Sequence, residues 1–396
     1  VERPRGAISW QLESVNSGIG SGIDVHLPAG PLVVRLDGSL RGAGDIGTPD
    51  GEPVHAFYLH GRRDLRNEQV DPPSPAADEV LVRFRAGGIC GSDMHYYHYG
   101  SNSGFDLVQP LVLGHEFAGE IVDAGRHGDR LPVGSRVAVD PSRPCRQCRY
   151  CVEGTYNLCR AMRYYGSAAT VPHVDGCFRE LVPALAERCH LLPDSISWAE
   201  GALLEPLSIA LHAASRAGDV AGRQILISGA GPIGQLLGMV TRHHGAASIT
   251  VTDVRHNVLD LAADLWADDA ILVGADAEMD AAAVHGGGFD VVIEASGATA
   301  ALYAAYERCN PGGLILQVGN QLGDAELPVN LALVRELTVR GSFRFAHQFG
   351  RAVELLASRR IDVSPLITNS LPFSSLPDAL ETALGATSLK VVLEHP

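Results

Sequence analysis

The segment from residue 224 to residue 253 constrains the fold more than any other part of this sequence. The apolar run "QILIS" predicts a strand, and Gly229, Gly231 and Gly234 follow it in the spacing G-x-G-x-x-G. A second apolar run, "SITVTD", ends at Asp253, 19 residues after Gly234. Two strands joined by a glycine-rich turn and a helix form the unit that binds dinucleotides at the edge of a parallel sheet. The alternative is a plain strand–helix turn without a ligand.

We expect this turn to hold the pyrophosphate of a nicotinamide dinucleotide. Glycines allow close approach of the backbone, and the helix N-terminus presents N–H donors and a positive dipole end. The Asp253 carboxylate would accept hydrogen bonds from the adenosine ribose and repel a 2′-phosphate, which favours NAD, while the nearby Arg255 keeps NADP possible. The expected cofactor-binding residues are Gly229, Gly231, Pro232, Ile233, Gly234, Asp253, Arg255 and, within "GLILQVG", Val318.

The patterns on either side of Pro206 differ. After it, short apolar strands alternate with helical segments such as "TAALYAAYERC", which predicts an α/β domain with a parallel sheet. From Val54 to Pro206, alternating runs such as "EVLVRFRAGGIC" and "EFAGEIVDAG" predict a β-rich domain. Residues 1–53 are glycine-rich with little periodicity, so we expect a disordered or weakly structured extension. No Met precedes Met94, and one hypothesis is that the native start lies near Val54.

The charge balance excludes several classes of partner. The formal net charge is −15, whereas nucleic acids and anionic membranes require a basic surface. The sequence contains no apolar stretch long enough for a membrane span and no basic-then-apolar start typical of a signal peptide. We therefore expect a cytoplasmic protein that acts on a small molecule, without nucleic-acid or membrane partners.

Four of the eight cysteines lie close together in "CRQCRYCVEGTYNLC". Cys145, Cys148, Cys151 and Cys159 have the spacing C-x2-C-x2-C-x7-C, and in a reducing compartment such clusters bind metal more often than they form disulfides. Four thiolates can surround one Zn²⁺ tetrahedrally and leave no open position, which indicates a structural site. An iron–sulfur cluster and unliganded thiols are the alternatives. Among the other cysteines, we expect those at 177, 189 and 309 to be buried thiols.

A second, sparser set of residues has the chemistry of a catalytic metal site. Cys90 stands in "GGICGSDMH", His115 in "GHEFAG" and Glu205 in "LEPLSIALHAA". Cysteine, histidine and a carboxylate can hold a zinc ion that keeps one position free for substrate. None of the three is specific alone, but together beside a dinucleotide motif they indicate a metal-dependent oxidoreductase. The aromatic stretch "HYYHYG" is expected to be a loop or a subunit contact rather than another metal site.

The motifs "GGICGSDMH", "GHE", the four-cysteine stretch and "GAGPIG" together resemble the zinc-dependent medium-chain dehydrogenase/reductase superfamily, over about residues 54–396. "LEPLSIALHA" resembles its polyol dehydrogenase branch, and "MRYYGSAATVPHVDG" and "GSFRF" resemble L-idonate 5-dehydrogenases. The resemblance implies a GroES-like catalytic domain over 54–206, a Rossmann NAD-binding domain over 207–345 and a return to the catalytic domain over 346–396. It also implies an active site between the domains and a homodimer or homotetramer.

The resemblance further implies which residues hold the catalytic zinc. Cys90, His115 and Glu205 would be the ligands, and Glu116 would be either a further ligand or a close neighbour. One thiolate, one neutral imidazole and one carboxylate neutralise Zn²⁺, whereas a second bound carboxylate would leave a net negative charge and activate the alcohol less. We therefore favour Glu116 beside the zinc rather than on it.

The remaining roles concern the proton and the substrate. Asp93 would hold His115 through a hydrogen bond, Ser92 would take the proton of the substrate hydroxyl, and His95 would pass it toward solvent. The expected reaction is oxidation of a secondary alcohol, with L-idonate to 5-keto-D-gluconate as the first choice and a sorbitol or xylitol dehydrogenase as the alternative. Arg344, with Arg163 as a weaker second candidate, would receive the substrate. Two further alternatives are a zinc-free reductase acting on quinones or enones and a zinc-ribbon protein that binds nucleic acid.

Overall fold

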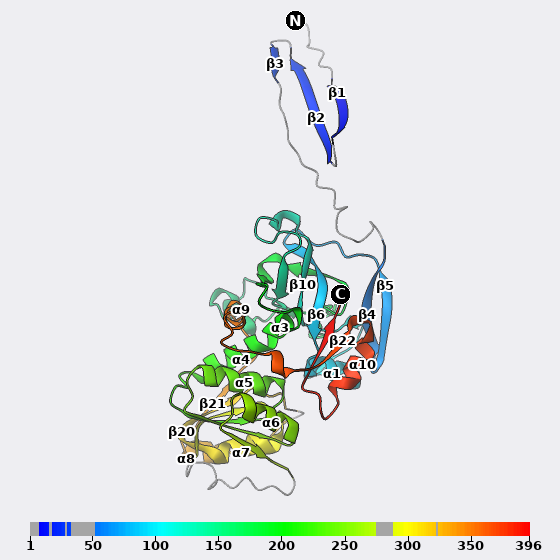
Figure 1. The fold of residues 1–396 in the computed structure, drawn as a ribbon. Helices are drawn as coiled ribbons and strands as arrows, with labels where there is room; N and C mark the ends of the chain where they lie inside the picture. The colour runs from blue at the N-terminus through cyan, green and yellow to red at the C-terminus, as the bar shows by residue number, and fades with distance from the viewer. Residues whose placement is uncertain (1–7, 16–17, 28–29, 33–51, 275–287, 322–323) are drawn as a thin grey trace. The chain divides into compact units, whose positions relative to one another are not determined.

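The computed structural model describes residues 8–15, 18–27, 30–32, 52–274, 288–321 and 324–396 (Figure 1). The chain divides into two units, Val1–Glu52 and Pro53–Pro396. In the first unit an antiparallel sheet contains β1 (Ile8–Val15), β2 (Gly18–Leu27) and β3 (Gly30–Leu32). Strands thus occur in a segment for which we expected disorder or weak structure, and the rest of that segment lies outside the described residues.

The middle of the second unit is a six-stranded parallel sheet with the order β18-β17-β16-β19-β20-β21. Its strands are β16 (Gln224–Ser228), β17 (Ser248–Asp253), β18 (Asp269–Leu272), β19 (Phe289–Glu294), β20 (Cys309–Gln317) and β21 (Thr338–Gly341). The associated helices are α5 (Pro232–His243), α6 (His256–Leu265), α7 (Thr299–Arg308) and α8 (Val329–Val334). Counted along the chain, this is the strand order 3-2-1-4-5-6 of the Rossmann fold, which confirms the predicted fold class.

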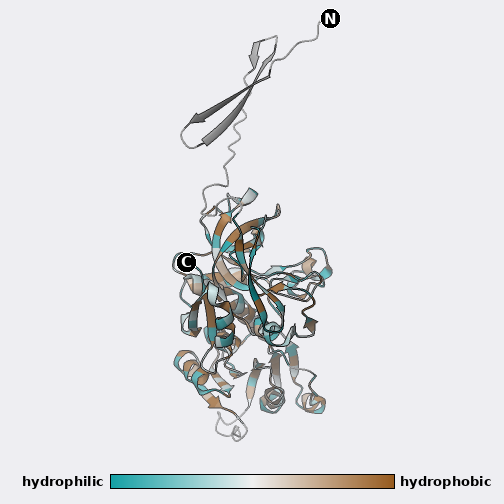
Figure 2. Ribbon diagram, turned by 90° about the vertical axis from the view of Figure 1, so that its right-hand side faces the viewer, coloured by the Kyte–Doolittle hydropathy of each residue, from teal (hydrophilic) through white to brown (hydrophobic). Residues whose placement is uncertain are grey.

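The core of this sheet follows from the apolar strands found in the sequence. Ile225, Ile227 and Ile293 are buried in one hydrophobic cluster, together with the inner faces of α5 and α4 (Leu204–Ala217). Because strands of a parallel sheet are covered on both faces, their sequences are almost continuously apolar rather than alternating. In Figure 2 the hydrophobic colour accordingly follows the strands and the covered helix faces.

The β-rich part of the second unit contains a seven-stranded sheet with the order β15-β11-β10-β6-β23-β22, in which β14 also pairs with β6. The strands are β6 (Glu79–Gly88), β10 (Glu116–Asp123), β11 (Arg136–Val139), β14 (Leu181–Leu185), β15 (Cys189–Leu191), β22 (Ile367–Pro372) and β23 (Lys390–Glu394). A smaller sheet contains β4 (Val54–Gly61), β5 (Asp64–Val70) and β9 (Leu111–Val112). Because β23 pairs with β6, the last residues of the chain return to the β-rich part of the second unit.

Shorter elements complete this domain. The helices are α1 (Gly91–Tyr99), α2 (Arg149–Val152), α3 (Trp198–Ala202), α9 (Phe349–Ala357) and α10 (Leu376–Ala383). Two-residue strands form the pairs β7 (Ser101–Asn102) with β8 (Phe105–Asp106) and β12 (Ser142–Arg143) with β13 (Arg163–Tyr164). Among the described residues, no helix has the length and apolar character needed to cross a membrane.

Helix α1 corrects one sequence expectation. The stretch "HYYHYG", expected as a loop, forms the last turns of α1, which ends at Gly100 with a left-handed φ of 68°. Cys90 is the N-cap of this helix, and the carboxylate of Asp93 accepts a hydrogen bond from the Cys90 backbone N–H at 2.9 Å. Sequence rules for helix starts look for Ser, Thr, Asp or Asn at the N-cap, so a cysteine cap escapes them.

Glycine 238 offers a test of packing in the Rossmann core. Replacing an interior helix glycine by alanine ordinarily stabilises a helix by about 1 kcal/mol. At Gly238 on α5, however, an added Cβ would lie 2.2–2.3 Å from ring atoms of Trp266. We expect Gly238→Ala to lower the free energy of unfolding by roughly 1–3 kcal/mol, measured by chemical denaturation.

The matched control is Gly350→Ala on α9, where an added Cβ meets nothing within 4 Å. This control is expected to be neutral or slightly stabilising. A Gly238→Ala variant as stable as Gly350→Ala would contradict the tight contact between α5 and Trp266.

Candidate active site

Three predicted site residues converge where β6 and β10 meet. Cys90 follows β6, His115 immediately precedes β10, and Glu116 is the first residue of β10, opposite Gly88. One potential ligand atom from each of the three side chains lies within 4.8 Å of the others. His115 and Glu116 are buried, at 7% and 1% exposure, while Cys90 is partly exposed. The group is therefore reachable from one side, through the cysteine.

This group fits a zinc ion. A soft thiolate, an imidazole nitrogen and a carboxylate oxygen are ligands that zinc accepts, and three protein ligands leave a fourth tetrahedral position for substrate. The three ligand atoms lie within 4.8 Å of one another, a spread that one bound ion can span. The residues that would hold the ion are thus already close together in the fold.

Glu205 occupies a different place from the one expected. It lies in the first turn of α4, is 4% exposed, and accepts a hydrogen bond from the Tyr164 hydroxyl at 2.6 Å. It does not belong to the group formed by Cys90, His115 and Glu116 among the described residues. The arrangement thus brings Glu116, rather than Glu205, next to the cysteine and histidine.

Residues of the candidate metal site nevertheless shift the pKa of Glu205. The pKa of its carboxyl is raised to about 7, mainly by burial and also by Glu116, against the opposing effects of His115 and the Tyr164 hydroxyl. Such electrostatic coupling requires Glu205 to lie near the group even though it lies outside its 4.8 Å spread. Glu205 is therefore a close neighbour of the candidate metal site.

Asp93 anchors the backbone on both sides of the candidate site. It is fully buried, and its two carboxylate oxygens accept hydrogen bonds from the backbone N–H of Cys90 at 2.9 Å and of Gly114 at 3.0 Å. Burial raises the pKa of Asp93, and the neighbouring His115 opposes that rise. His115 Nδ1 lies 3.8 Å from Asp93 Oδ1, too far for the hydrogen bond we expected, so Asp93 acts on His115 through charge and through the backbone of Gly114.

Lys390 is a component that the sequence analysis missed. Its ammonium group, only 3% exposed, contacts Glu116 Oε2 and donates a hydrogen bond to the Ile89 carbonyl at 2.9 Å. Burial alone would lower the pKa of Lys390, but Glu116 and Cys90 raise it above its ordinary value. Its only sequence signal is a single lysine at the start of the apolar run "KVVLE", which by itself is uninformative.

Ser92 and His95 lie three residues apart on α1, so both project from the same side of this helix. Both are partly exposed. His95 Nδ1 lies 3.2 Å from the side-chain oxygen of Asn102, and because that oxygen only accepts, Nδ1 is the protonated nitrogen and Nε2 is left as an acceptor. This tautomer suits a histidine that takes a proton from a neighbouring hydroxyl.

Arg344 and Arg163 differ in their surroundings. The Arg344 guanidinium carbon lies 4.7 Å from the ring centres of both Tyr164 and Phe343, and burial lowers the pKa of this guanidinium. It makes no hydrogen bond or ion pair with any side chain that the structure describes. Arg163 is exposed. Through Tyr164, which bonds to Glu205, Arg344 is one contact away from the candidate site, whereas the Arg163 side chain has no such contact among the described residues.

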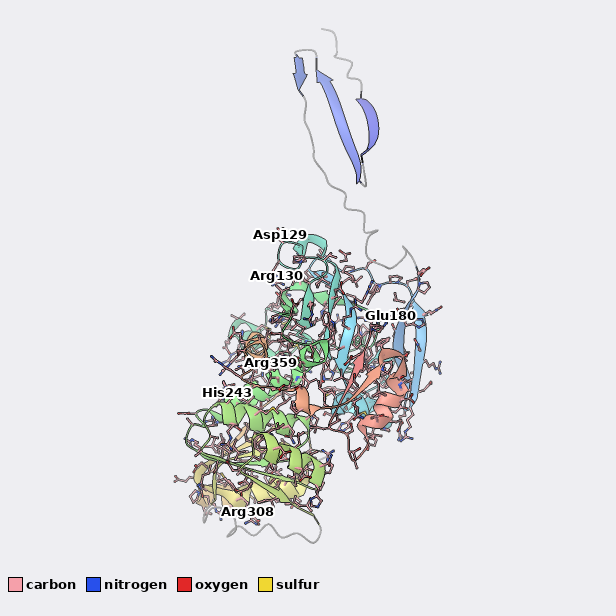
Figure 3. All side chains as sticks on the ribbon, in the orientation of Figure 1. Asp129, Arg130, Glu180, His243, Arg308 and Arg359 are labelled. Atoms are coloured by element: carbon pink, nitrogen blue, oxygen red, sulfur yellow. The ribbon has the colours of Figure 1, made fainter. Side chains whose placement is uncertain are left out.

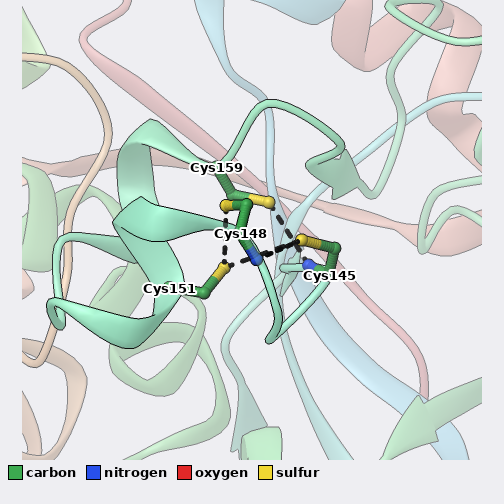
Figure 4. Close-up of side chains that lie close together, drawn as sticks. All are labelled: Cys145, Cys148, Cys151 and Cys159. Carbon is green, nitrogen blue, oxygen red and sulfur yellow. Dashed lines mark hydrogen bonds between the residues drawn. The ribbon is translucent and has the colours of Figure 1, made fainter.

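The four clustered cysteines form a second metal-binding group (Figure 4). All four are free, and sulfur–sulfur distances of 3.6 Å (Cys148 to Cys151) and 4.0 Å (Cys145 to Cys151) match the edge of about 3.8 Å in a tetrahedron with 2.3 Å zinc–sulfur bonds. Backbone N–H groups point at the sulfurs, and the one from Cys151 is the main cause that lowers the pKa of Cys148 to about 6. The geometry fits a closed structural zinc site. The cysteines at 177, 189 and 309 are buried and free.

The glycine-rich turn has the form expected for a dinucleotide site. Gly229 has a φ of +98°, which favours glycine, and a Cβ at Gly234 would lie 1.8 Å from the Gly229 carbonyl oxygen. Helix α5 then begins at Pro232, with Gly231 as its N-cap and Ile233 in its first turn. Its first N–H groups lack partners within the helix and are available to an anion.

Asp253 stands at the end of β17 and faces this turn. Its carboxylate accepts hydrogen bonds from the backbone N–H groups of Ala230 at 2.7 Å and Arg255 at 3.0 Å, and the Arg255 side chain lies 3.6 Å away. Val318, just beyond β20, donates its N–H to the carbonyl of Glu294 at the end of the neighbouring β19. The residues singled out from the sequence therefore lie along the carboxyl ends of adjacent strands, where dinucleotides bind on such sheets.

Comparisons with known proteins agree with this arrangement. The family model of the alcohol dehydrogenase GroES-like domain matches residues 76–194, and that of the zinc-binding dehydrogenases matches residues 232–358. The chain is 37% identical over 344 residues to a sorbitol dehydrogenase of Bombyx mori, covering 86% of this chain and 98% of that protein. It is 39% identical over 306 residues to the L-idonate 5-dehydrogenase (NAD(P)(+)) of Escherichia coli (strain K12), covering 77% and 88%. The crystal structure of L-idonate 5-dehydrogenase from E. coli K-12 matches with a TM-score of 0.81 at 35% identity, covering 87% of this chain and 99% of that one.

The two metal-binding groups predict two zinc ions per chain, one for each group. We expect Cys151→Ser to remove one ion and to lower the melting temperature by roughly 5 °C or more, because a structural zinc contributes directly to folding free energy. Elemental analysis and calorimetry measure both effects. Cys309→Ser, a change at a buried cysteine outside both groups, is the control and should retain two ions. Retention of two ions by Cys151→Ser would contradict the assignment.

Proposed function

The chain belongs to the zinc-dependent medium-chain dehydrogenases, among the polyol and sugar-acid dehydrogenases that use NAD(P), and we propose that its own substrate is L-idonate, oxidised to 5-keto-D-gluconate. Support for this substrate comes from the similarity to the L-idonate 5-dehydrogenase of E. coli in both sequence and structure. The observation that carries the enzyme class is the convergence of the partly exposed Cys90 with the buried His115 and Glu116, beside Glu205.

When bound, zinc supplies a Lewis acid for the substrate oxygen and the nicotinamide supplies a hydride acceptor. We assign the ion at this group to Cys90, His115 and Glu116, with Glu205 as the alternative third ligand. In this proposal Ser92 accepts the proton of the substrate hydroxyl, and His95 receives it through Nε2, because its Nδ1 faces the side-chain oxygen of Asn102 at 3.2 Å. Because both side chains are partly exposed, the proton has a path to solvent.

Arg344 is our choice for the residue that binds the polar end of the substrate. It is a half-buried cation whose guanidinium stacks on Tyr164 and has no acidic partner in the described parts of the chain. An unpaired, partly desolvated guanidinium favours a carboxylate or a hydroxyl-rich ligand. Because either ligand suits it, Arg344 does not separate a sugar acid from a neutral polyol. The similarity to sorbitol dehydrogenase of Bombyx mori therefore keeps sorbitol or xylitol as the second candidate substrate.

The proposal extends to the cofactor form and to the cellular context. Asp253 at the end of β17 favours NAD over NADP, because its carboxylate would repel a 2′-phosphate. Eight free cysteines agree with a reducing, cytoplasmic location. We further propose that the enzyme acts as a homodimer or homotetramer.

A substrate panel tests the proposed function. L-Idonate, gluconate, sorbitol, xylitol and threonine are each supplied with NAD and with NADP, and reduced nucleotide is followed by absorbance at a fixed pH. We expect the highest kcat/KM with L-idonate and NAD. Turnover of sorbitol but not of L-idonate would replace the substrate and leave the enzyme class unchanged.

Replacement of Arg344 tests the substrate contact. We expect Arg344→Ala to raise KM for L-idonate at least tenfold, because one charge-assisted hydrogen bond to a carboxylate contributes about 1.5–3 kcal/mol. The KM for NAD should stay constant. Arg163→Ala, which removes an exposed arginine directly before Tyr164, is the matched control and should behave like the unchanged enzyme. An Arg344→Ala variant with unchanged KM would remove this residue from the substrate site.

A further inference from the structure

The segment from Phe343 to His347 is held in an unfavourable backbone conformation. It connects β21 of the parallel sheet to α9, and so carries the chain out of the Rossmann domain. Arg344 has a φ of 51° and His347 a φ of 60°, both in the left-handed region that residues with a Cβ rarely occupy. Two such residues within four positions persist only where the surrounding structure holds them.

Contacts from the four-cysteine lobe, residues 145–159, stabilise this conformation. The Asn157 side-chain amide donates to the Phe343 carbonyl at 3.0 Å, and the Tyr156 hydroxyl accepts the backbone N–H of His347 at 2.8 Å. The His347 ring adds a contact of 2.8 Å to the Gly154 carbonyl and packs against the Tyr156 ring with centres 4.8 Å apart. One polar contact holds the segment at Phe343 and two hold it at His347, so the segment is fixed on both sides of Arg344.

These contacts originate from one short part of the lobe. Gly154, Tyr156 and Asn157 all lie between the third cysteine, Cys151, and the fourth, Cys159. Asn157 is 5% exposed, and its amide nitrogen faces the Phe343 carbonyl and, at 3.4 Å, His212 Nε2 rather than solvent. The stretch is thus bracketed by two cysteines of the four-cysteine group.

The ring against which the Arg344 guanidinium packs, Tyr164, lies just beyond the lobe in the sequence. Tyr164 follows Cys159 by five residues, its ring lies under the Arg344 guanidinium, and its hydroxyl bonds to Glu205. Because Arg344 has no hydrogen bond or ion pair of its own to described residues, its direction depends on its backbone and on this ring. Both are tied to the lobe.

We propose that the four-cysteine lobe positions Arg344 for the substrate, with Tyr156 and Asn157 as positioning residues, and is not only a local staple of the catalytic domain. The proposal rests on the role assigned to Arg344 in the proposed function. It predicts that small changes at the lobe surface weaken substrate binding while the metal, the cofactor site and the reaction step are left intact.

The test uses the full chain with Tyr156→Phe and Asn157→Leu. Tyr156→Phe keeps the ring that packs on His347 and removes only the hydroxyl, which guards against misfolding of the Asn157 variant. Thr155→Ala is the matched control, because the Thr155 hydroxyl bonds to the Tyr150 carbonyl within the lobe and not to the segment. Zinc content and melting temperature verify that each variant is intact.

We expect both variants to raise KM for L-idonate, or for sorbitol if that is the substrate, about fivefold, with kcat within twofold and KM for NAD unchanged. Hydrogen exchange in the peptide spanning residues 342–349 should accelerate, while Thr155→Ala changes neither quantity. In an Arg344→Ala background, Tyr156→Phe and Asn157→Leu should raise KM no further, because the group that they position is gone.

Two results would overturn the inference while leaving the proposed function in place. One is an unchanged KM in both lobe variants when Arg344→Ala itself raises KM. The other is an equal rise in KM with and without Arg344, which would indicate a general loss of structure. An unchanged KM in Arg344→Ala would instead contradict the proposed role of Arg344, and the inference with it.

Discussion

Neutralisation of buried acids is the constraint on which this structure depends. Asp93, Glu116 and Glu205 are all less than 5% exposed, and Glu116 lies close enough to raise the pKa of both Asp93 and Glu205. Burying carboxylates without partners is costly, so the fold must supply donors and positive charge. Backbone N–H groups donate to Asp93, the Tyr164 hydroxyl donates to Glu205, and the Lys390 ammonium pairs with Glu116. Lys390 reaches the site only because β23 returns from the end of the chain to pair with β6. The pairing of β23 with β6 therefore determines both the topology of the catalytic domain and the charge balance of the site.

This neutralisation changes how the metal ligands are judged. From charge counting alone, a second carboxylate on zinc would leave the site negative, which is why the sequence analysis favours Glu116 beside the zinc rather than on it. The contact of Lys390 with Glu116 offsets that charge, so the electrostatic objection to Glu116 disappears. Geometry then favours Glu116, since it lies with Cys90 and His115 whereas Glu205 is bonded to Tyr164. The two carboxylates thus have different places, Glu116 within the group and Glu205 beside it.

Much of the fold could be predicted from local pattern. Each strand of the parallel sheet was visible as an apolar run, since strands covered on both faces need little else. Helix α1 was missed because its N-cap is Cys90, a residue that local rules do not recognise as a cap. Cys90 is both the N-cap of α1 and a candidate metal ligand, so a cysteine stands where sequence rules look for a capping residue.

The sequence by itself determined the two features in which all participating residues are neighbours. The glycine turn ending in Asp253 and the four-cysteine lobe are encoded at short spacing, because ligands on one loop must follow one another closely in the chain. Tertiary structure alone decided which distant groups meet. Lys390 bonds to a carbonyl 301 positions away, and Asn157 to one 186 positions away. Such contacts arise from strand pairing and domain packing, which bring together residues that no periodicity or motif connects.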